Sequence, residues 1–333
     1  MTSGSKYDAG IIGAGAWGTT LANHLGLKGS KVLLWAFEDY VVDEINGAHK
    51  NTPFLEGFDL SENISATTSL GDFRNVPRLI IVVPSEFYGK TVENLREHVS
   101  GEVLILSATK GFVGPGLQRP SERLRVVFPE NKIGVLSGPN LAREIAGGLP
   151  AISRVASENS GLISEFQPFL STERFRIYGG MDVIGTELGG ALKNIIALAA
   201  GMVDELKLGE NTLAALITRG LAGMIKFAAI LGADERTLFG VSGLGDLVCT
   251  CQSRLSRNHT VGRRLARGES IEEILKSMKA VAEGINTTRQ VFDYAKLHGL
   301  DLPITSAVHG VIFEKTDPQE ALRQLMTRTL KME

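Results

Sequence analysis

This chain of 333 residues has few cysteines, no histidines spaced as metal-ligand pairs and a small net charge. Its two cysteines, Cys249 and Cys251, stand one residue apart, a spacing that fits neither a disulfide framework nor a zinc knuckle. The six histidines are scattered without the spacing of metal ligands, so no metal site is expected. A net charge of −2 gives no signal for binding a polyanion, so we expect no nucleic-acid partner, although local phosphate sites remain open.

Long apolar segments are also missing. The first ten residues, MTSGSKYDAG, hold no apolar signal region, and no uninterrupted apolar run reaches about 18 residues. We therefore expect no membrane span and a reducing, cytoplasmic location. The chain does contain 43% hydrophobic and 22% charged residues, the profile of a soluble globular protein with about two domains.

The first half of the chain alternates short apolar strands with helices and carries a glycine-rich turn. An expected strand over 7–12 runs into Gly13, Gly15 and Gly18, a helix follows, and a second strand covers 31–36. In this βαβ setting the first glycine makes the turn, the second lets the backbone approach a pyrophosphate, and the third packs helix on strand. The helix N-terminus offers free N–H groups to phosphates, so the unit predicts a bound dinucleotide.

Two residues near this turn leave alternatives open. Glu38 follows the second strand, where an acidic side chain binds the ribose hydroxyls of NAD, but it can also point into solvent. Trp17 either covers the phosphates or packs against the domain. The sequence therefore predicts NAD or NADP as the cofactor without deciding between them.

Three further apolar strands, expected at 79–83, 103–106 and 132–136, end in polar turns, and the first two of these turns contain Pro84 and Lys110. The carboxyl ends of parallel strands share one edge of a sheet, where open α/β sheets bind ligands. Lys110 would therefore lie beside the nicotinamide, unless it is an exposed turn lysine. Two more strands, at 151–156 and 174–178, and a helix between them at 160–170 complete this half.

Beyond Gly180 the hydrophobic period changes from that of strands to that of helices. We predict an α/β Rossmann-type domain over 1–181, with a mostly parallel sheet and helices on both faces, and an all-α domain over 182–333, with the site between them. The expected helical landmarks are a helix over 211–231 capped by Asn211 or Thr212, a capping box at Ser270 and Glu273, a helix over 286–298 ended by Gly299, and a first-turn proline at Asp317-Pro318.

The stretch 185–204 is the centre of the helical half. At helical spacing it has a bulky apolar stripe and, elsewhere, a strip of small residues around Lys193, the one charged side chain between Leu188 and Val203. Burial lowers the pKa of a lysine towards neutrality, which suits a proton-transfer catalyst. The competing interpretation is a structural lysine that snorkels from the helix or pairs with Glu187.

A glycine-rich stretch over 242–258 holds a second group of polar residues. We interpret its start as a loop of tight turns that presents Asp246, followed by a helix with Ser256 as N-cap and Arg257 and Asn258 in its first turn. An arginine, an amide and free N–H groups at a helix start form a phosphate site. Arg257 can instead belong to a solvated basic face, because three more arginines follow it.

With these residues in place, the chain resembles the NAD(P)-dependent glycerol-3-phosphate dehydrogenases over nearly its whole length. The motifs that carry the resemblance, in the family's order, are GAGAWGTTLA after the first strand, SATKGF at Lys110, SGPNLAREI at Gly138, ELGGALKN at Lys193, ITRGL at Arg219, GLGDLVCTC at Asp246, SRN at Arg257 and VAEG at Glu283. The resemblance implies reversible hydride transfer between sn-glycerol 3-phosphate and dihydroxyacetone phosphate, a supply of glycerol 3-phosphate for phospholipid synthesis, and a homodimer.

The resemblance also implies roles for individual residues. Lys193 is implied as the proton acceptor or donor, Lys110 as a neighbour of substrate and nicotinamide, and Asp246 as the carboxylate that holds the substrate and the lysine. The implied substrate-binding residues are Lys110, Gly138, Asn140, Lys193, Asn194, Asp246, Ser256, Arg257 and Asn258. The implied cofactor-binding residues are Gly13, Gly15, Ala16, Trp17, Gly18, Phe37, Pro84, Lys110, Ala142, Arg257, Val281 and Glu283.

Departures from the family pattern concern the cofactor rather than the reaction, since Ala16 and Phe37 stand where many members carry a polar and a charged residue. Two other functions stay open. A related two-domain dehydrogenase for another hydroxy acid would share the first domain but lack the phosphate clamp at Arg257. A non-catalytic nicotinamide-binding sensor would have lost Lys193 or Asp246, and this sequence retains both.

Overall fold

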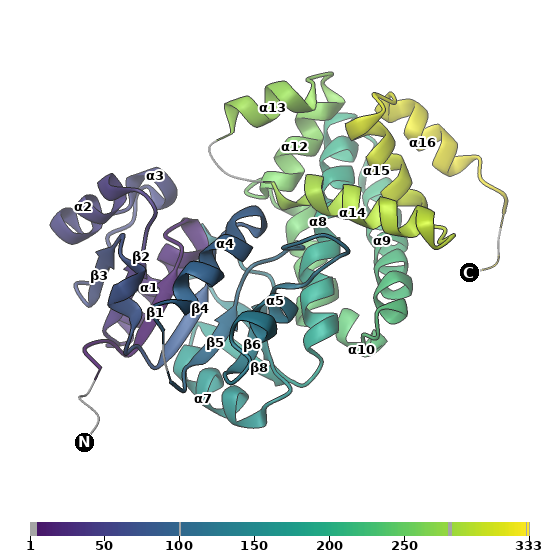
Figure 1. Cartoon of the computed structure of the whole chain (residues 1–333). Coiled ribbons are helices and arrows are strands. Elements are labelled where there is room, and N and C mark those ends of the chain that lie inside the picture. The colour runs from purple at the N-terminus through teal and green to yellow at the C-terminus, as the bar shows by residue number, and fades with distance from the viewer. Residues whose placement is uncertain (1–4, 100, 279–281, 331, 333) are drawn as a thin grey trace.

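The computed structural model describes residues 5–99, 101–278, 282–330 and 332, and it consists of a sheet-containing part followed by a helical part (Figure 1). The strands are β1 (Ala9–Ile12), β2 (Val32–Trp35), β3 (Ile64–Thr67), β4 (Arg78–Ile81), β5 (Leu104–Ser107), β6 (Lys132–Ser137), β7 (Ala151–Ala156) and β8 (Phe175–Gly180). The helices among and around them are α1 (Ala16–Leu27), α2 (Asp39–Ala48), α3 (Thr52–Leu55), η1 (Leu70–Phe73), α4 (Ser85–Arg96), α5 (Pro120–Val127), α6 (Ala142–Ala146) and α7 (Ser160–Leu170).

The eight strands form one sheet in the order β3-β2-β1-β4-β5-β6-β7-β8. Every neighbouring pair is parallel except β6 and β7, so the expected mostly parallel Rossmann-type sheet is confirmed. The chain leaves β1 towards β2 and β3 and then returns to the other side of β1 as β4, which makes the β1–β4 edge the point where ligands bind in such sheets. The sequence prediction missed β3, because the four residues of this strand, ISAT, carry too little apolar pattern to signal one.

Helices cover both faces of the sheet. Successive residues of a strand point to opposite faces, so neighbours in a strand belong to different hydrophobic clusters. Ile11 packs in a cluster with Leu21 of α1 and Leu162 of α7, whereas its neighbour Ile12 packs in a second cluster with Leu124 of α5. Burying each such side chain stabilises the fold by about 1.5–3 kcal/mol. This double cover explains why the strands appear in the sequence as continuous apolar runs rather than as alternating ones.

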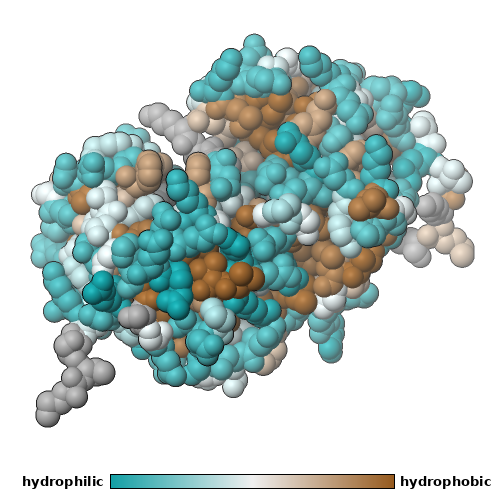
Figure 2. Space-filling model, in the orientation of Figure 1, coloured by the Kyte–Doolittle hydropathy of each residue, from teal (hydrophilic) through white to brown (hydrophobic). Residues whose placement is uncertain are grey.

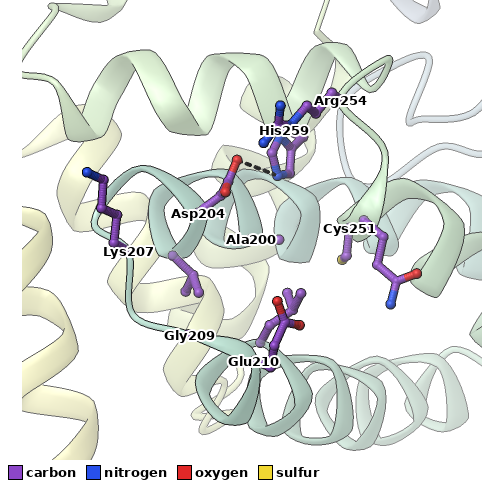
Figure 3. A pocket seen from close by; sticks show the side chains of 11 residues that line it. Ala200, Asp204, Lys207, Gly209, Glu210, Cys251, Arg254 and His259 are labelled. Carbon is purple, nitrogen blue, oxygen red and sulfur yellow. Dashed lines mark ion pairs between the residues drawn. The ribbon is translucent and has the colours of Figure 1, made fainter.

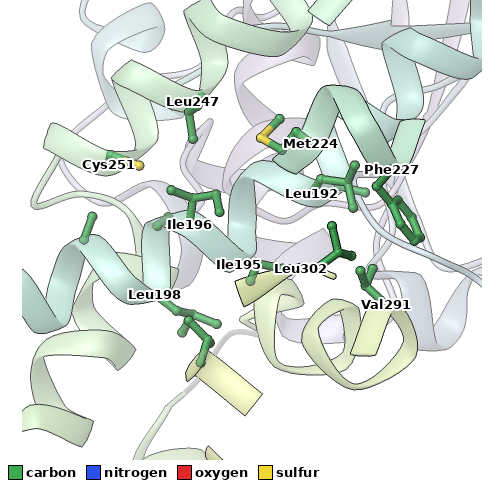
Figure 4. Close-up of a cluster of buried hydrophobic side chains, with 14 of the residues drawn as sticks. Leu192, Ile195, Ile196, Leu198, Met224, Phe227, Leu247, Cys251, Val291 and Leu302 are labelled. Atoms are coloured by element: carbon green, nitrogen blue, oxygen red, sulfur yellow. The ribbon is translucent and has the colours of Figure 1, made fainter. Parts of the chain in front are cut away.

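The helical part is built around α8 (Val183–Glu205), whose residues are buried nearly all round. The other helices are α9 (Glu210–Ile230), α10 (Glu235–Leu238), the π-helical turn η2 (Val241–Gly245), α11 (Asp246–Gln252), α12 (Arg257–Ala266), α13 (Ile271–Ser277), α14 (Glu283–Leu297), α15 (Pro303–Phe313) and α16 (Pro318–Met326). Figure 4 shows Leu192, Ile195 and Ile196 of α8 among side chains from its neighbours, including Phe227 of α9 and Leu247 of α11. The helix is therefore the core of this part rather than a surface helix with one apolar stripe.

Most of the expected helix boundaries are confirmed. Ser270 and Glu273 form a capping box, Asp317 caps α16 ahead of Pro318, and Gly299 follows α14 with a φ of +64°. The cap predicted for the helix over 211–231 is wrong. This helix, α9, begins at Glu210, and its N-cap is Gly209, which has a φ of +82° and no side chain that could cap the helix. Glycine adopts this positive φ without strain, and the negative charge of Glu210 in the first turn stabilises the helix N-terminus in place of a capping side chain.

Two described helices, α8 and α9, are long and apolar enough to cross a membrane by length and composition alone. The apolar window of α8 is 89% buried inside the protein, as in the core helix of a globular fold, whereas that of α9 is 28% buried. The outer face of α9 exposes Ala214, Ala215, Ala222 and Ile230. Figure 2 shows hydrophobic residues gathered at the surface over α9, so within the described residues this helix keeps an exposed, alanine-rich face, on which Arg219 and Lys226 are also exposed.

Candidate active site

The glycine-rich turn lies between β1 and α1, beside the end of β4. Gly13 has a φ of +120°, and a Cβ there would lie 2.7 Å from the carbonyl oxygen of Val82. A Cβ on Gly18 would collide with the carbonyl oxygen of Gly13, whereas nothing lies within 4 Å of a Cβ built on Gly15. The three positions thus provide a tight turn, an open backbone and close helix packing, which is the fit that a dinucleotide pyrophosphate needs.

Residues predicted for the adenosine half of the cofactor lie around this turn. Ala16 begins α1, and Phe37 follows β2 with a side chain that is 79% exposed. Trp17 is half-buried and packs edge-on against Phe175, with ring centroids 6.3 Å apart. This contact favours the packing role of Trp17 over a role as a cover for phosphates.

The remaining predicted cofactor contacts are distributed between the two parts. Pro84 precedes α4 at the end of β4, and Ala142 begins α6 with its carbonyl oxygen 3.3 Å from the Thr20 hydroxyl that donates to it. Both residues follow the carboxyl end of a strand, Pro84 after β4 and Ala142 after β6. Val281 lies outside the described residues.

Lys193 is only 6% exposed at the centre of α8. Its Nζ donates to Asp246 Oδ1 at 2.6 Å and to Thr250 Oγ1 at 2.6 Å. The snorkelling interpretation does not fit such burial, and the pairing with Glu187 is wrong, because the carboxylate beside Lys193 is that of Asp246. The sequence prediction missed Thr250, although it stands one helical turn after Asp246 and its hydroxyl donates to the Asp246 carbonyl at 2.7 Å.

Asp246 is 1% exposed and binds a second amine, because its Oδ2 accepts from Lys110 Nζ at 2.6 Å. Lys110 also donates to the carbonyl oxygen of Gly138 at 2.7 Å and is 18% exposed in its side chain, so it is not a solvated turn lysine. Burial lowers the pKa of Lys110 to about 8, with Asp246 acting in the opposite direction and the charge of Lys193 lowering it further. One carboxylate therefore joins a lysine of the sheet edge to a lysine of the helical core.

The stretch that carries Asp246 is helical and not the loop that its glycines predict. Residues Val241–Gly245 form a π-helical turn that continues directly into α11, which begins at Asp246. The turn packs on α8 so closely that a Cβ on Gly189 would collide with the carbonyl oxygen of Ser242. The glycines allow this approach of two helical backbones, and the approach places the Asp246 carboxylate on Lys193.

Three buried polar atoms near this cluster have no hydrogen-bond partner among the described residues: Ser137 Oγ, Asn140 Nδ2 and Ser242 Oγ. Asn140 keeps its amide oxygen occupied by a hydrogen bond from Ser153 Oγ at 3.1 Å. Ser137 Oγ lies beside α8, 2.6 Å from where a Cβ on Gly190 would stand. Buried polar groups of this kind need partners, so these atoms are suited to substrate oxygens. The sequence prediction named Asn140 but neither serine.

The predicted phosphate clamp lies at the start of α12. Ser256 is the N-cap, as expected, and its Oγ accepts from the backbone N–H of His259 at 3.2 Å. The side chain of Arg257 is exposed. The surrounding protein still removes part of the water around its guanidinium and so lowers its pKa, whereas the negative charge of Glu283 raises it. No ion pair holds Arg257 within the ranges that the structure describes. An uncommitted guanidinium at a helix N-terminus is suited to a phosphate.

The two amides predicted to bind substrate, Asn194 and Asn258, are bound to each other. Asn258 Nδ2 donates to Asn194 Oδ1 at 2.9 Å, and Asn258 Oδ1 accepts from the backbone N–H of Gly284 at 3.0 Å. Asn194 Nδ2 donates to the carbonyl oxygen of Gly190 at 3.3 Å. These contacts join α8, α12 and α14, so the amide pair anchors the start of α12, and Arg257 with it, to the helix that carries Lys193.

Glu283 crosses from the start of α14 to the sheet edge. Its carboxylate accepts from the backbone N–H of Ser85 at 2.9 Å and also from the Ser85 hydroxyl. A Cβ on Gly111 would lie 2.9 Å from Glu283 Oε2, so the carboxylate borders the turn that carries Lys110. Burial raises the pKa of Glu283, against the hydrogen bonds from Ser85. The sequence did not predict the contact between Ser85 and Glu283, since no local pattern marks a partner so distant in the chain.

A cavity of about 540 Å³ lies apart from this cluster, between the C-terminal half of α8, the start of α9 and the segment before α12 (Figure 3). Its lining includes Asp204, Lys207, Arg254 and His259, none of which is a predicted site residue. His259 Nε2 lies 3.8 Å from Asp204 Oδ2. The cavity contains neither the paired lysines nor the glycine-rich turn, so we place the candidate site at Lys193.

The cluster combines the groups that a hydride-transfer site for a phosphorylated substrate needs. The buried amines of Lys110 and Lys193 can move a proton at a substrate oxygen and stabilise negative charge that develops there. The glycine-rich turn is open for a dinucleotide, and Arg257 is placed for a phosphate. Asp246 joins Lys110, which follows β5 at the carboxyl edge of the sheet, to Lys193 of α8, so the amines lie where the sheet edge faces that helix.

The chain is similar to known proteins over nearly its whole length. The family described as NAD-dependent glycerol-3-phosphate dehydrogenase N-terminus matches residues 8–163, and the corresponding C-terminus family matches residues 182–323. Two relatives named glycerol-3-phosphate dehydrogenase, NAD(P)+, come from Syntrophotalea carbinolica and Streptomyces griseus. The first is 43% identical over 97% of this chain and 98% of its own, and the second 39% identical over 98% of each. A crystal structure of glycerol-3-phosphate dehydrogenase from Coxiella burnetii matches with a TM-score of 0.93 at 37% identity, covering 98% of this chain and 100% of that one.

Proposed function

The chain belongs to the NAD-dependent glycerol-3-phosphate dehydrogenase family, and from this premise we propose that Lys193 exchanges the proton in its reaction. The protein is an NAD(P)-dependent oxidoreductase that acts on a CH–OH group and interconverts sn-glycerol 3-phosphate and dihydroxyacetone phosphate. The observation that carries the proposal is the buried cluster in which Asp246 holds both Lys193 and Lys110 at 2.6 Å.

The proton path follows from the chemistry of these side chains. In the oxidative direction the unprotonated amine of Lys193 accepts the hydroxyl proton, and in the reductive direction its ammonium form returns a proton to the carbonyl oxygen. The nicotinamide, when bound, supplies or takes up the hydride. Asp246 and Thr250 fix the direction of the Lys193 amine. Lys110 places a second amine against the same carboxylate and stabilises negative charge on the substrate oxygen.

The substrate phosphate does not react, so its role is to position the carbon that does. We propose that Arg257 and the free N–H groups at the start of α12 bind this phosphate, while Gly138 and Asn140 bind the three-carbon body. The support is the exposed guanidinium at a capped helix start and the unpartnered Asn140 Nδ2. Ser137 Oγ and Ser242 Oγ are additional donors to the same region.

We further propose that the glycine-rich turn, Pro84, Lys110, Ala142 and Glu283 bind the cofactor. Around the adenosine half Ala16 and Phe37 present neither a carboxylate nor a cation, whereas Glu38 at the start of α2 is an acid of the kind that binds the ribose hydroxyls of NAD, so the cofactor is NAD or NADP. We propose that Glu283 faces the nicotinamide side, and the support is its contact with Ser85 and its position beside the turn that carries Lys110.

The function is tested by following the absorbance of reduced nicotinamide in the presence of dihydroxyacetone phosphate. We expect oxidation of NADH or NADPH that depends on this substrate, and the ratio of the two kcat/KM values gives the cofactor preference. A 2-keto acid should give no turnover, because it lacks the phosphate that Arg257 binds. Turnover with the keto acid alone would assign the protein to a different dehydrogenase, and cofactor binding without any turnover would support the sensor.

Cellular role and location follow from the resemblance. We propose that the protein works in the cytoplasm and supplies glycerol 3-phosphate for phospholipid synthesis. What supports this is the match to bacterial relatives along nearly the whole chain.

We also propose that the protein is a homodimer joined through the exposed apolar face of α9. The support is a helix whose apolar window is only 28% buried within the chain. Light scattering should give about twice the chain mass of 35.8 kDa for the native protein. Ala222→Glu, in the middle of that face, should give single chains, because it places a charge in the interface.

The control for this variant is Ala48→Glu, which adds the same charge at an exposed alanine of α2 in the sheet-containing part. It should leave the mass of the native protein unchanged. A native protein that is monomeric at micromolar concentration, or a dimer unaffected by Ala222→Glu, would remove α9 as the interface.

A further inference from the structure

Glu187 is a buried carboxylate on α8 that precedes Lys193 in the same helix but does not contact it. Its side chain is 4% exposed, and its partners all belong to the sheet-containing part. The backbone N–H of Ser121 donates to Glu187 Oε1 at 2.8 Å, and the Ser121 hydroxyl donates to Oε2 at 2.6 Å. Arg119 adds its charge, with Nε at 3.2 Å from Oε2. Glu187 therefore joins the two parts of the molecule.

The contact between Glu187 and Ser121 lies at the N-terminus of α5, a helix that follows the turn with Lys110 in the chain. Ser121 is the second residue of α5, so the carboxylate lies at the positive end of that helix and accepts one of its free N–H groups. Helix α5 connects the turn that carries Lys110 to β6, whose carboxyl end carries Gly138. A contact that holds α5 thus holds the element between two turns of the active site.

Among the described residues, Glu187 is one of three carboxylates of the helical part that accept hydrogen bonds from the sheet-containing part. Asp246 accepts from Lys110, Glu283 accepts from Ser85, and Glu187 accepts from Ser121. The first two border the site and are expected to face substrate or cofactor. Glu187 lies outside the cluster, and Ser121 satisfies both of its oxygens, so its contact remains available whatever the site binds.

We propose that Glu187 is a positioning residue, whose two hydrogen bonds to Ser121 fix α8 against α5 and thereby hold Lys193 in register with Lys110. Catalysis depends steeply on such register, since a displacement of about 1 Å can cost about a hundredfold in rate. This inference rests on the proposed role of Lys193 in proton transfer. It assigns to Glu187 the alignment of the two lysines, and no contact with the reacting atoms.

The pKa of Glu187 allows its effect on activity to be measured separately from its effect on stability. Burial raises the pKa of Glu187 to about 7, against the Ser121 hydrogen bonds and the charge of Arg119, while Glu122 raises it further. Tyr88 of α4 is the other titratable group that faces it. Because the folded pKa lies above the unfolded value of about 4.3, the stability that this group contributes is complete below the unfolded pKa and is lost as the pH rises through about 7.

A neutral side chain avoids that loss, which makes Glu187→Gln a sharp test. At about pH 8 the variant should show a kcat about tenfold lower with a KM for dihydroxyacetone phosphate within about twofold of the native value, because register and not binding is disturbed. Its midpoint of thermal unfolding at this pH should be unchanged or higher. The native kcat should also fall as the pH is lowered through about 7, in a component that the variant lacks.

Two further variants complete the experiment. Ser121→Ala removes the hydroxyl donor but keeps the backbone N–H, so its kcat should fall in the same way by a smaller factor. Glu158→Gln removes a carboxylate that pairs with Arg125 on the same α5 without crossing to the helical part, and it should leave kcat unchanged. An unchanged kcat in Glu187→Gln, or a kcat that falls only together with thermal stability, overturns the proposal. Neither outcome affects the role of Lys193, which fails only if Lys193→Ala keeps its activity.

Discussion

Replacing Lys193 with alanine is expected to lower kcat for dihydroxyacetone phosphate reduction by about 10²–10⁴-fold, the range that general acid–base groups contribute. The loss should fall on kcat and not on cofactor affinity, because Lys193 contacts Asp246 and Thr250 and none of the glycines of the dinucleotide turn. The measurement is steady-state kinetics, together with a titration of NADH binding by its fluorescence. The dissociation constant for NADH should change by less than about twofold.

Folding of this variant needs its own check, because the substitution leaves Asp246 buried with one amine fewer. An unmatched buried acceptor costs about 1–3 kcal/mol, so some loss of thermal stability is expected. The NADH titration shows whether the molecule is still folded at the assay temperature. Lys276→Ala is the control, since this lysine is exposed at the end of α13 and should leave both constants unchanged. Substantial residual turnover in folded Lys193→Ala would show that another group exchanges the proton. Lys110, which binds the same carboxylate, would then be the first candidate.

The features that could be predicted from the sequence are those whose cause is local. The glycine-rich turn over Gly13, Gly15 and Gly18 can be recognised within six residues, and the structure shows a steric need for glycine at Gly13 and Gly18 and open space at Gly15. A single charge within an apolar helix likewise marks Lys193, because only burial or function retains it there. The parallel order of the strands then places Lys110 at the correct edge without any knowledge of contacts.

The features that could not be predicted depend on residues far apart in the chain. Nearness in sequence makes Glu187 a candidate partner of Lys193, whereas in the fold Asp246, 53 positions away, is the carboxylate that binds it. The glycines before Asp246 predict a loop, because glycine allows tight turns, yet here glycine lets a π-helical turn approach α8. Backbone contacts of this kind carry no periodicity that a sequence pattern could record.

Substitution of Arg257 by alanine is expected to raise the KM for dihydroxyacetone phosphate by about ten- to a hundredfold, with a much smaller rise in the KM for the nicotinamide. A charge-assisted hydrogen bond contributes about 1.5–3 kcal/mol, which corresponds to that range. The helix N-terminus and its Ser256 cap remain in the variant, so part of the phosphate affinity should persist. Equal increases in both constants would place the phosphate site elsewhere.

The same arginine can be tested against the alternative that it belongs to a general basic face. Arg263 lies on the same helix but is held by Glu205, with Nη2 at 3.0 Å from Oε2, so Arg263→Ala should leave the KM for dihydroxyacetone phosphate unchanged. Dihydroxyacetone, which lacks the phosphate, isolates the contact itself. The native enzyme and Arg257→Ala should reduce it with equal kcat/KM, because removing either the phosphate or the guanidinium already eliminates their interaction. A lower rate in the variant with this shorter substrate would show that Arg257 acts on the reacting carbon or on the cofactor, and the clamp would then have to be assigned to other groups at the start of α12.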